Sequence, residues 1–170
     1  MAENIVLNTV MHPFEPIYDS DSKILILGTI PSEKSREKGF YYAHSSNKFW
    51  NLISDICGCD LPKSVEEKKE MLLKNHIAIC DVLEKTKIYK SLDSSIKREN
   101  SSGTDIDSII RQTKITRIFA NGDKAEKGYN WFNKGIVGMP REKLPSSSGL
   151  YTGMTYEEKL KAWSVIKQYL

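Results

Sequence analysis

The chain has 170 residues, of which 39% are hydrophobic, and its 25 Lys and Arg against 22 Asp and Glu give a formal net charge of +3. This length predicts one domain, residues 1–170, that can bury a hydrophobic core, and the small net charge does not by itself require nucleic acid as a partner. The first residues contain neither a basic region nor a long apolar stretch, so we expect no signal peptide and no membrane span, and a cytoplasmic location.

Apolar and amphipathic segments alternate in the first half of the chain. A strand is predicted over Ile24–Leu27 and a helix over Asn47–Ile56, where apolar residues recur at helical spacing. Ser64-Val-Glu-Glu67 is a capping-box sequence, which predicts a helix running to about residue 74. A second strand is predicted over Ile77–Leu83. The polar segment 85–103, which is rich in Ser and Lys, is expected to be a long loop with a functional role or high mobility.

The second half of the chain continues this alternation. Thr104 is expected to cap a helix over 105–112, and a third strand follows over Thr116–Ala120. A helix is predicted over 123–132. Thr155-Tyr-Glu-Glu158 is a second capping box, which opens a last helix to residue 169.

This order of elements predicts the fold class. It indicates an α/β sandwich, in which a parallel sheet is covered by helices on both faces. Ligands of such sheets bind beyond the carboxyl ends of the strands. The loops that begin at Gly28, near Val82 and at Asn121 should therefore meet at one edge and form the site.

The three cysteines are Cys57, Cys59 and Cys80. They are too few and too unevenly spaced for a disulfide framework, and their number excludes a four-cysteine iron–sulfur site. A metal ion could be held with His76 as the fourth ligand, but two of the cysteines fall at a predicted helix end and Cys80 falls inside an apolar strand. We therefore expect reduced, mostly buried thiols and no metal.

Two loop sequences indicate a binding pocket. Gly28-Thr-Ile-Pro-Ser32 follows the first predicted strand and leads to Gly39-Phe-Tyr-Tyr-Ala-His-Ser-Ser-Asn-Lys-Phe-Trp50. Leu144-Pro-Ser-Ser-Ser-Gly149 lies about a hundred residues further on. Aromatic rings beside an amide can present their faces to a flat ligand and a polar group to its edge or to a water molecule.

These segments resemble the uracil-DNA glycosylase superfamily, and most closely its hypoxanthine-DNA (deoxyinosine) glycosylase branch. His12-Pro-Phe-Glu-Pro16 also resembles the start of those proteins, so the resemblance covers nearly the whole chain. It implies a three-layer sandwich with a central, mostly parallel four-stranded sheet. It also implies a monofunctional DNA glycosylase of base excision repair that needs no cofactor and no metal.

Such an enzyme flips a deaminated base out of the DNA and hydrolyses its N-glycosidic bond, which leaves an abasic site. Hypoxanthine is the expected base and uracil the second candidate, because both carry a carbonyl where the parent base had an amine. The expected partner is double-stranded DNA, with single-stranded DNA left open.

The catalytic groups depart from the common pattern of the superfamily. In many members the third residue of the first loop motif is an Asp or Asn that positions water, whereas here it is Ile30. The hypoxanthine branch shares this loss. The resemblance implies that Asn47 is the main catalytic group and that Asn121 binds the base or orders the water. The alternatives are a helix cap at Asn47 and a strand-to-helix turn at Asn121.

We call the segment Gly39–Trp50 the aromatic loop. One of its rings is expected to stack on the flipped base. The resemblance favours Phe40, and the alternative is that all the rings pack beneath the loop. His44 could be protonated and stabilise an anionic base, or be structural. The base-binding residues implied are Gly28, Thr29, Ile30, Phe40, Tyr42 and His44.

We call the segment Leu144–Tyr151 the serine loop. By resemblance, it is expected to hold the DNA backbone and to place an apolar wedge in the gap left by the base. Gly149-Leu-Tyr151 stands where the hypoxanthine branch usually has Pro-Ala-Asn. Leu150 or Tyr151 is therefore the expected wedge, unless the loop is a surface turn that buries Leu150. The DNA-binding residues implied are Pro31, Ser32, Ser35, Pro145, Ser146, Ser147, Ser148, Leu150 and Tyr151.

Two functions of other classes stay open at this point. One is a nucleic-acid-binding module that has kept the fold and lost catalysis, which Ile30 permits and the retained Asn47 argues against. The other is a hydrolase of free nucleosides or nucleotides, for which a wedge loop would serve no purpose.

Overall fold

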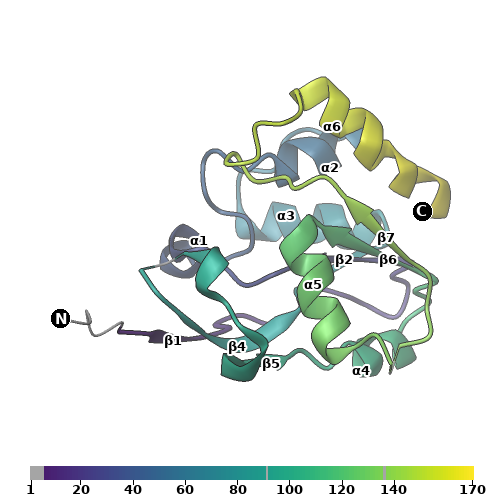
Figure 1. Cartoon of the computed structure of the whole chain (residues 1–170). Coiled ribbons are helices and arrows are strands. Elements are labelled where there is room, and N and C mark those ends of the chain that lie inside the picture. Colours follow the sequence, from purple (N-terminus) through teal and green to yellow (C-terminus); the bar gives the residue numbers. More distant parts are fainter. Residues whose placement is uncertain (1–5, 91, 136) are drawn as a thin grey trace.

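The computed structural model describes residues 6–90, 92–135 and 137–170, and a parallel sheet lies at its centre (Figure 1). All neighbouring strands of this sheet are parallel. Their order is β3 (Ile77–Asp81), β2 (Ile24–Gly28), β6 (Arg117–Asn121) and β7 (Arg141–Leu144). The sequence prediction did not locate β7, because three of its four residues are charged and only Leu144 is buried.

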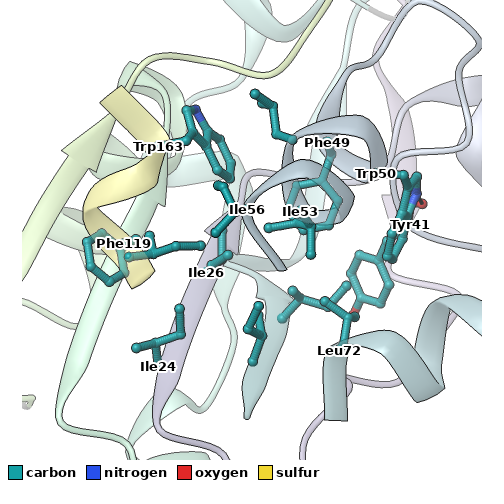
Figure 2. Packing of buried hydrophobic residues seen from close by; sticks show 14 of the residues in the cluster. Ile24, Ile26, Tyr41, Phe49, Trp50, Ile53, Ile56, Leu72, Phe119 and Trp163 are labelled. Carbon is teal, nitrogen blue, oxygen red and sulfur yellow. Dashed lines mark hydrogen bonds between the residues drawn. The ribbon is translucent and has the colours of Figure 1, made fainter. Parts of the chain in front are cut away.

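Helices cover both faces of this sheet, which confirms the predicted α/β sandwich. Side chains alternate along β2, so that Ile24 and Ile26 belong to one core cluster and Leu25 and Leu27 to the other. Figure 2 shows the first cluster, where Phe49, Ile53 and Trp163 pack over Ile24 and Ile26. The helices on that side are α2 (Phe49–Cys57), α3 (Val65–Lys74) and α6 (Tyr156–Trp163), and those on the other are α4 (Ile106–Arg111) and α5 (Asp123–Phe132).

A second, antiparallel sheet corrects two predictions. Its strands, in order, are β1 (Asn8–Met11), β4 (Leu83–Ile88) and β5 (Ser101–Gly103). The predicted long loop over 85–103 is therefore wrong at its two ends, which belong to β4 and β5, and the predicted strand over Ile77–Leu83 divides into β3 and β4. The reason is that β4 is only half-buried: Leu83, Thr86 and Ile88 point inward between exposed charged residues. The buried Thr86 hydroxyl is satisfied by the Ser101 hydroxyl at 2.6 Å.

The helix ends follow the predicted capping residues at two places and not at a third. The Ser64 hydroxyl caps α3, and Thr155 forms a complete capping box with Glu158 at α6. Thr104 does not cap α4. Asp105 does so, because the Thr104 hydroxyl donates instead to the Asp81 carbonyl oxygen at 2.6 Å.

The last predicted helix changes its geometry along its length. It is α-helical as far as Trp163 and continues as a 3₁₀ helix over Ser164–Tyr169. A short helix that was not predicted, α1 (Glu33–Lys38), follows β2 and is capped by the Ser32 hydroxyl. It leads the chain from the sheet edge into the aromatic loop.

Candidate functional site

A cavity of about 420 Å³ lies at the carboxyl edge of the parallel sheet. The three predicted loops meet there, since Gly28, Asp81 and Asn121 are the last residues of β2, β3 and β6. Among the residues expected in the site, those that line the cavity are Gly28, Thr29, Ile30, Pro31, Ser32, Ser35, Tyr42, His44, Asn47, Asn121, Ser146, Ser147, Ser148 and Leu150.

The two asparagines are joined through a fully buried serine. The Ser147 hydroxyl donates to Asn47 Oδ1 at 2.9 Å and accepts from Asn121 Nδ2 at 2.8 Å. The Ser147 amide also donates to Asn121 Oδ1 at 2.9 Å. This network connects residues 26 and 100 positions apart in the sequence. It fixes the orientation of both amides.

Asn47 keeps its amide nitrogen for the cavity. Its Oδ1 accepts from the Phe49 backbone N–H at 2.9 Å as well as from Ser147. A backbone N–H can only donate, so it places the oxygen toward the helix and Nδ2 away from it. Lys48 is the residue at the N-cap of α2. The Asn47 Oδ1 thus bonds to the first turn of α2, as in the alternative role of a helix cap. Its Nδ2 is left as a donor for the site.

The structure places Tyr42, and not Phe40, at the cavity. Phe40 is buried in the core beside Trp50, with ring centroids 5.8 Å apart. Tyr42 has a left-handed backbone, φ 52°, and its ring stacks on Phe49 at 4.0 Å. Burial, together with the charge of Asp81, raises the pKa of Tyr42, so the hydroxyl stays protonated at neutral pH. Phe40 and Tyr42 are aromatic residues of the same short segment, so the sequence does not show which of the two rings reaches the cavity.

His44 and Ser35 serve local structure. His44 Nδ1 accepts from the Ser46 backbone N–H at 3.1 Å. The Ser35 side chain is buried, and its hydroxyl accepts from the Ala43 backbone N–H at 3.1 Å. Ser35 thus fixes the return of the chain after α1, whereas Ser32 is exposed at the cavity rim.

The loop after β7 projects one leucine into solvent. Leu150 is 92% exposed, which excludes the alternative that the loop buries it. The loop is held from α6 by the buried Lys159, whose Nζ donates to the carbonyl oxygens of Ser148 and Tyr151 at 3.2 and 2.9 Å. A Cβ at Gly149 would overlap Ser46, so only glycine allows this close approach.

Two predicted DNA contacts lie outside the cavity lining. The Pro145 carbonyl oxygen accepts from the Trp163 indole N–H at 2.8 Å, which anchors the start of the serine loop to α6. Tyr151 is partly exposed, and Lys159 Nζ lies 5.2 Å from the centre of its ring. Tyr151 therefore supports the loop from the side facing α6.

Two residues of the cavity region were missed from the sequence. Asp81 lines the cavity at the end of β3, and its Oδ2 lies 2.7 Å from Nε2 of His12. Its position as the last residue of a strand at the site edge was the signal that could have found it. His12 gave no such signal, because it reaches the site only through the pairing of β1 with β4.

The cysteines show no arrangement for a metal site. Cys80 is buried in β3, Cys57 is half-buried and Cys59 is exposed. Within the described ranges, no group of three or more His, Cys, Asp and Glu side chains is placed to hold a metal ion. No helix in those ranges is long and apolar enough to cross a membrane.

Comparison with known proteins gives consistent matches. A family model described as the uracil DNA glycosylase superfamily matches residues 15–167. A hypoxanthine DNA glycosylase of Methanosarcina acetivorans is 36% identical over 138 residues, which cover 80% of this chain and 85% of that protein. One of Methanosarcina barkeri is 38% identical over 87 residues, or 51% of this chain and 55% of the relative. A solution NMR structure from M. acetivorans, described as a "putative Uracil DNA glycosylase", matches with a TM-score of 0.77 and 30% identity, over 91% of this chain and 94% of that one.

Proposed function

The chain belongs to the uracil DNA glycosylase superfamily, and on this premise we propose that it is a DNA glycosylase that removes hypoxanthine from DNA. The observation that carries the proposal is the pair of asparagines, joined by Ser147, in the lining of a cavity of about 420 Å³, a volume typical of small-molecule sites. The two hypoxanthine DNA glycosylases among the relatives support hypoxanthine as the substrate. Uracil as a second substrate and the cytoplasmic location stay predictions.

The reaction is a displacement at the sugar. The bond between C1′ of the deoxyribose and N9 of hypoxanthine breaks, and its electron pair leaves with the base. A water oxygen forms the new bond to C1′, and the proton it loses passes to the departing base. The transition state carries positive charge on the sugar and negative charge on the base, so fixed hydrogen-bond donors lower its free energy.

Asn47 is the group that we assign to this step. Its Nδ2 is the part of the side chain left for the cavity, since Oδ1 already accepts two hydrogen bonds. By donating to the water oxygen, Nδ2 holds the water and leaves its second lone pair to attack C1′. This arrangement needs no carboxylate at position 30, which is consistent with Ile30 on the cavity wall.

The other residues position the DNA. Asn121 holds Ser147 and through it Asn47, which makes Asn121 a positioning residue. The Tyr42 ring takes over the stacking role expected of Phe40, because Tyr42 lines the cavity. Ser32, Ser146 and Ser148 are assigned to the phosphates, and Leu150 to the gap left in the duplex.

The test compares Asn47→Ala with the wild type on duplexes that carry one hypoxanthine, one uracil or no lesion, followed by alkaline cleavage of abasic sites. We expect lesion-specific cleavage by the wild type and a loss on the order of 10²-fold or more in the variant. Asn130→Ala, an exposed substitution on α5, is the matched control.

Folding is checked by the thermal midpoint of each variant. If Asn47→Ala is too unstable, Asn47→Ser keeps an oxygen for the Phe49 N–H and still lacks the amide. Full activity of a folded Asn47 variant would refute the assignment of this residue. Wild-type protein that cleaves none of the lesions would refute the proposed function.

A further inference from the structure

Three lysines gather beside the aromatic loop, and the catalytic step does not use them. Lys38 ends α1, and Lys68 and Lys69 lie in the first half of α3. The Lys68 Nζ lies 5.2 Å from the centre of the Trp50 ring and 6.0 Å from that of Phe40. The Lys69 Nζ lies 5.9 Å from the centre of the Phe40 ring. We call Lys38, Lys68 and Lys69 the lysine cluster.

The lysine cluster lies next to the cavity of about 420 Å³ that we assign to the flipped base. The Lys38 Nζ donates to the carbonyl oxygen of Ala43 at 3.3 Å. The residues on either side of Ala43, which are Tyr42 and His44, line that cavity. The other end of the aromatic loop contacts the serine loop through Asn47. DNA whose flipped nucleotide enters the cavity continues on both sides of it, so its backbone has to pass over the surface next to the aromatic loop.

In the part of the chain that the structure describes, no ion pair joins a carboxylate to Lys38, Lys68 or Lys69. Lys34, which is also on α1, shows the difference, because its Nζ pairs with Glu37 at 3.1 Å. Burial lowers the pKa of Lys68, and the positive charge of Lys38 lowers it further. Both effects oppose a charged lysine in the free protein. An anion bound to the lysine cluster would offset the repulsion between its charges.

The aromatic rings hold Lys68 in place before any ligand binds. Its Nζ lies within cation–π distance of both Trp50 and Phe40. A lysine that is free in solvent loses side-chain entropy when a ligand immobilises it. A lysine that is already held loses less, so it binds an anion at a smaller entropic cost.

The anion that fits the lysine cluster is the phosphate backbone of DNA. Duplex DNA carries one negative charge per about 1.7 Å of helix axis, so a short length of backbone can neutralise several neighbouring lysines. The ammonium group of a lysine is a point charge, which binds phosphate without requiring one fixed orientation. Phosphate contacts of this kind position the protein on the duplex and read no sequence.

Resting on the proposed function, we propose that the lysine cluster binds the phosphate backbone of the DNA that flanks the flipped nucleotide. The cluster contacts no base, so it strengthens binding to any DNA sequence and leaves the choice of lesion to the cavity. It adds charged contacts to the uncharged serine hydroxyls that we assign to the phosphates. A purely structural role, in which the lysines only cover Phe40 and Trp50, would leave DNA binding independent of their charge.

The experiment measures the affinity for an undamaged duplex between about 50 and 200 mM salt, because this measurement does not need excision. The variant Lys38→Met/Lys68→Met removes two charges and keeps unbranched apolar side chains at both positions. We expect the slope of log K against log salt concentration to become shallower by about 2, since each phosphate contact contributes about 0.9. At the low-salt end we expect the affinity to fall by about 10-fold or more. The thermal midpoint should not fall, because the change relieves the repulsion between the two lysines.

The matched control is Lys74→Met/Lys167→Met. It removes the same charge from two exposed lysines outside the cluster, on the last turn of α3 and on the 3₁₀ helix over Ser164–Tyr169. This control should keep the wild-type slope. Lys38→Arg/Lys68→Arg keeps both charges and should keep that slope as well.

An unchanged slope in Lys38→Met/Lys68→Met, or an equal change in the Lys74→Met/Lys167→Met control, would overturn the proposal. If the cluster variant does not fold, Lys69→Met decides, with an expected change of about 1 in the slope. The two proposals fail separately. A wild type that removes hypoxanthine while the cluster variant keeps its slope refutes only the role of the lysine cluster. A wild type that removes no base refutes the proposed function, whatever its salt dependence.

Discussion

Ser147 is the side chain on which both site asparagines depend. Its hydroxyl and amide bond to Asn47 and Asn121, and its carbonyl oxygen accepts from the Lys48 backbone N–H at 2.9 Å. The serine loop and the start of α2 are therefore locked together at one point. The orientation of the Asn47 side chain therefore depends on Ser147 as well as on the start of α2.

Replacing Ser147 with Ala should lower both stability and activity. The change leaves Asn47 Oδ1 with one partner fewer and the Asn121 amide nitrogen without its acceptor, which costs about 1–3 kcal/mol of the free energy of unfolding. Urea unfolding measures this loss, and single-turnover excision measures the effect of a misplaced Asn47. Ser20→Ala, an exposed serine outside the site, is the control. Unchanged excision by Ser147→Ala would show that the network does not position Asn47.

Gly28 is required by its neighbours and not by its backbone angles. Its φ is not in the left-handed region, but a Cβ there would overlap the Asp81 carboxylate and lie 2.8 Å from the Tyr42 hydroxyl. Even the smallest side chain must displace one of these two groups, and both border the cavity.

Gly28→Ala should therefore reduce excision by 10-fold or more, with a stability loss of about 1–3 kcal/mol from overpacking. Gly138→Ala is the matched control, since nothing lies within 4 Å of a Cβ at that position. The measurements are single-turnover rates and urea unfolding of the two variants. Wild-type excision by Gly28→Ala would mean that the cavity adapts, and would contradict the close packing around Gly28.

At the scale of elements, the loop after β7 is rigid at its base and exposed at its tip. Lys159 holds the carbonyl oxygens of residues 148 and 151, while the leucine between them makes little contact with the protein. Gly149 lets the same loop pack against Ser46. Gly149, which stands where the hypoxanthine branch usually has Pro, thus allows the serine loop to contact the aromatic loop at Ser46.

Leu150→Ala should slow excision from duplex DNA by 10-fold or more without reducing stability. An exposed leucine contributes little to folding, but in the duplex it would replace the stacking lost when the base leaves. Duplex and single-stranded substrates are compared, because the loss should be confined to the duplex. Leu61→Ala, which shortens an exposed leucine outside the cavity lining, should change neither rate. An equal loss on both substrates would argue against the wedge.

At the scale of the whole molecule, buried acidic groups make the fold sensitive to alkali. Burial raises the pKa of the Cys57 thiol from 9.0 to about 11, and it also raises the pKa of Cys80, Tyr41 and Tyr42. In the unfolded chain these groups ionise near their ordinary values. Above that pH the unfolded state has lost protons that the folded state still holds.

The free energy of unfolding should therefore be flat near neutral pH and fall as the pH rises above about 9. Urea midpoints at pH 7, 9 and 10 measure this fall. Cys57→Ser, whose hydroxyl does not ionise in this range, should fall less steeply than the wild type. Stability that stays constant from pH 7 to 10 would contradict the burial of these groups.

Elements with strong local signals were predictable from the sequence alone. The continuous apolar runs of β2, β3 and β6 and the capping residues Ser64 and Thr155 depend on neighbouring residues only, so they could be predicted without the fold. The family motifs placed Asn47 and Asn121 at the same site for the same reason, since each follows a recognisable segment of chain.

The side chains that complete the site come together through contacts that form only in the folded chain. Phe40 and Tyr42 are chemically alike in the sequence, and the left-handed backbone at Tyr42 and the packing of Phe40 on Trp50 separate them. Asp81 meets His12 across 69 positions through a strand pairing that no local pattern encodes. The strand β4 was missed for a similar reason. Its sequence is rich in charged residues, and which of its side chains are buried depends on the segments that pack against it. Local sequence sets the propensity of each segment, whereas contacts between distant segments set the geometry of the site.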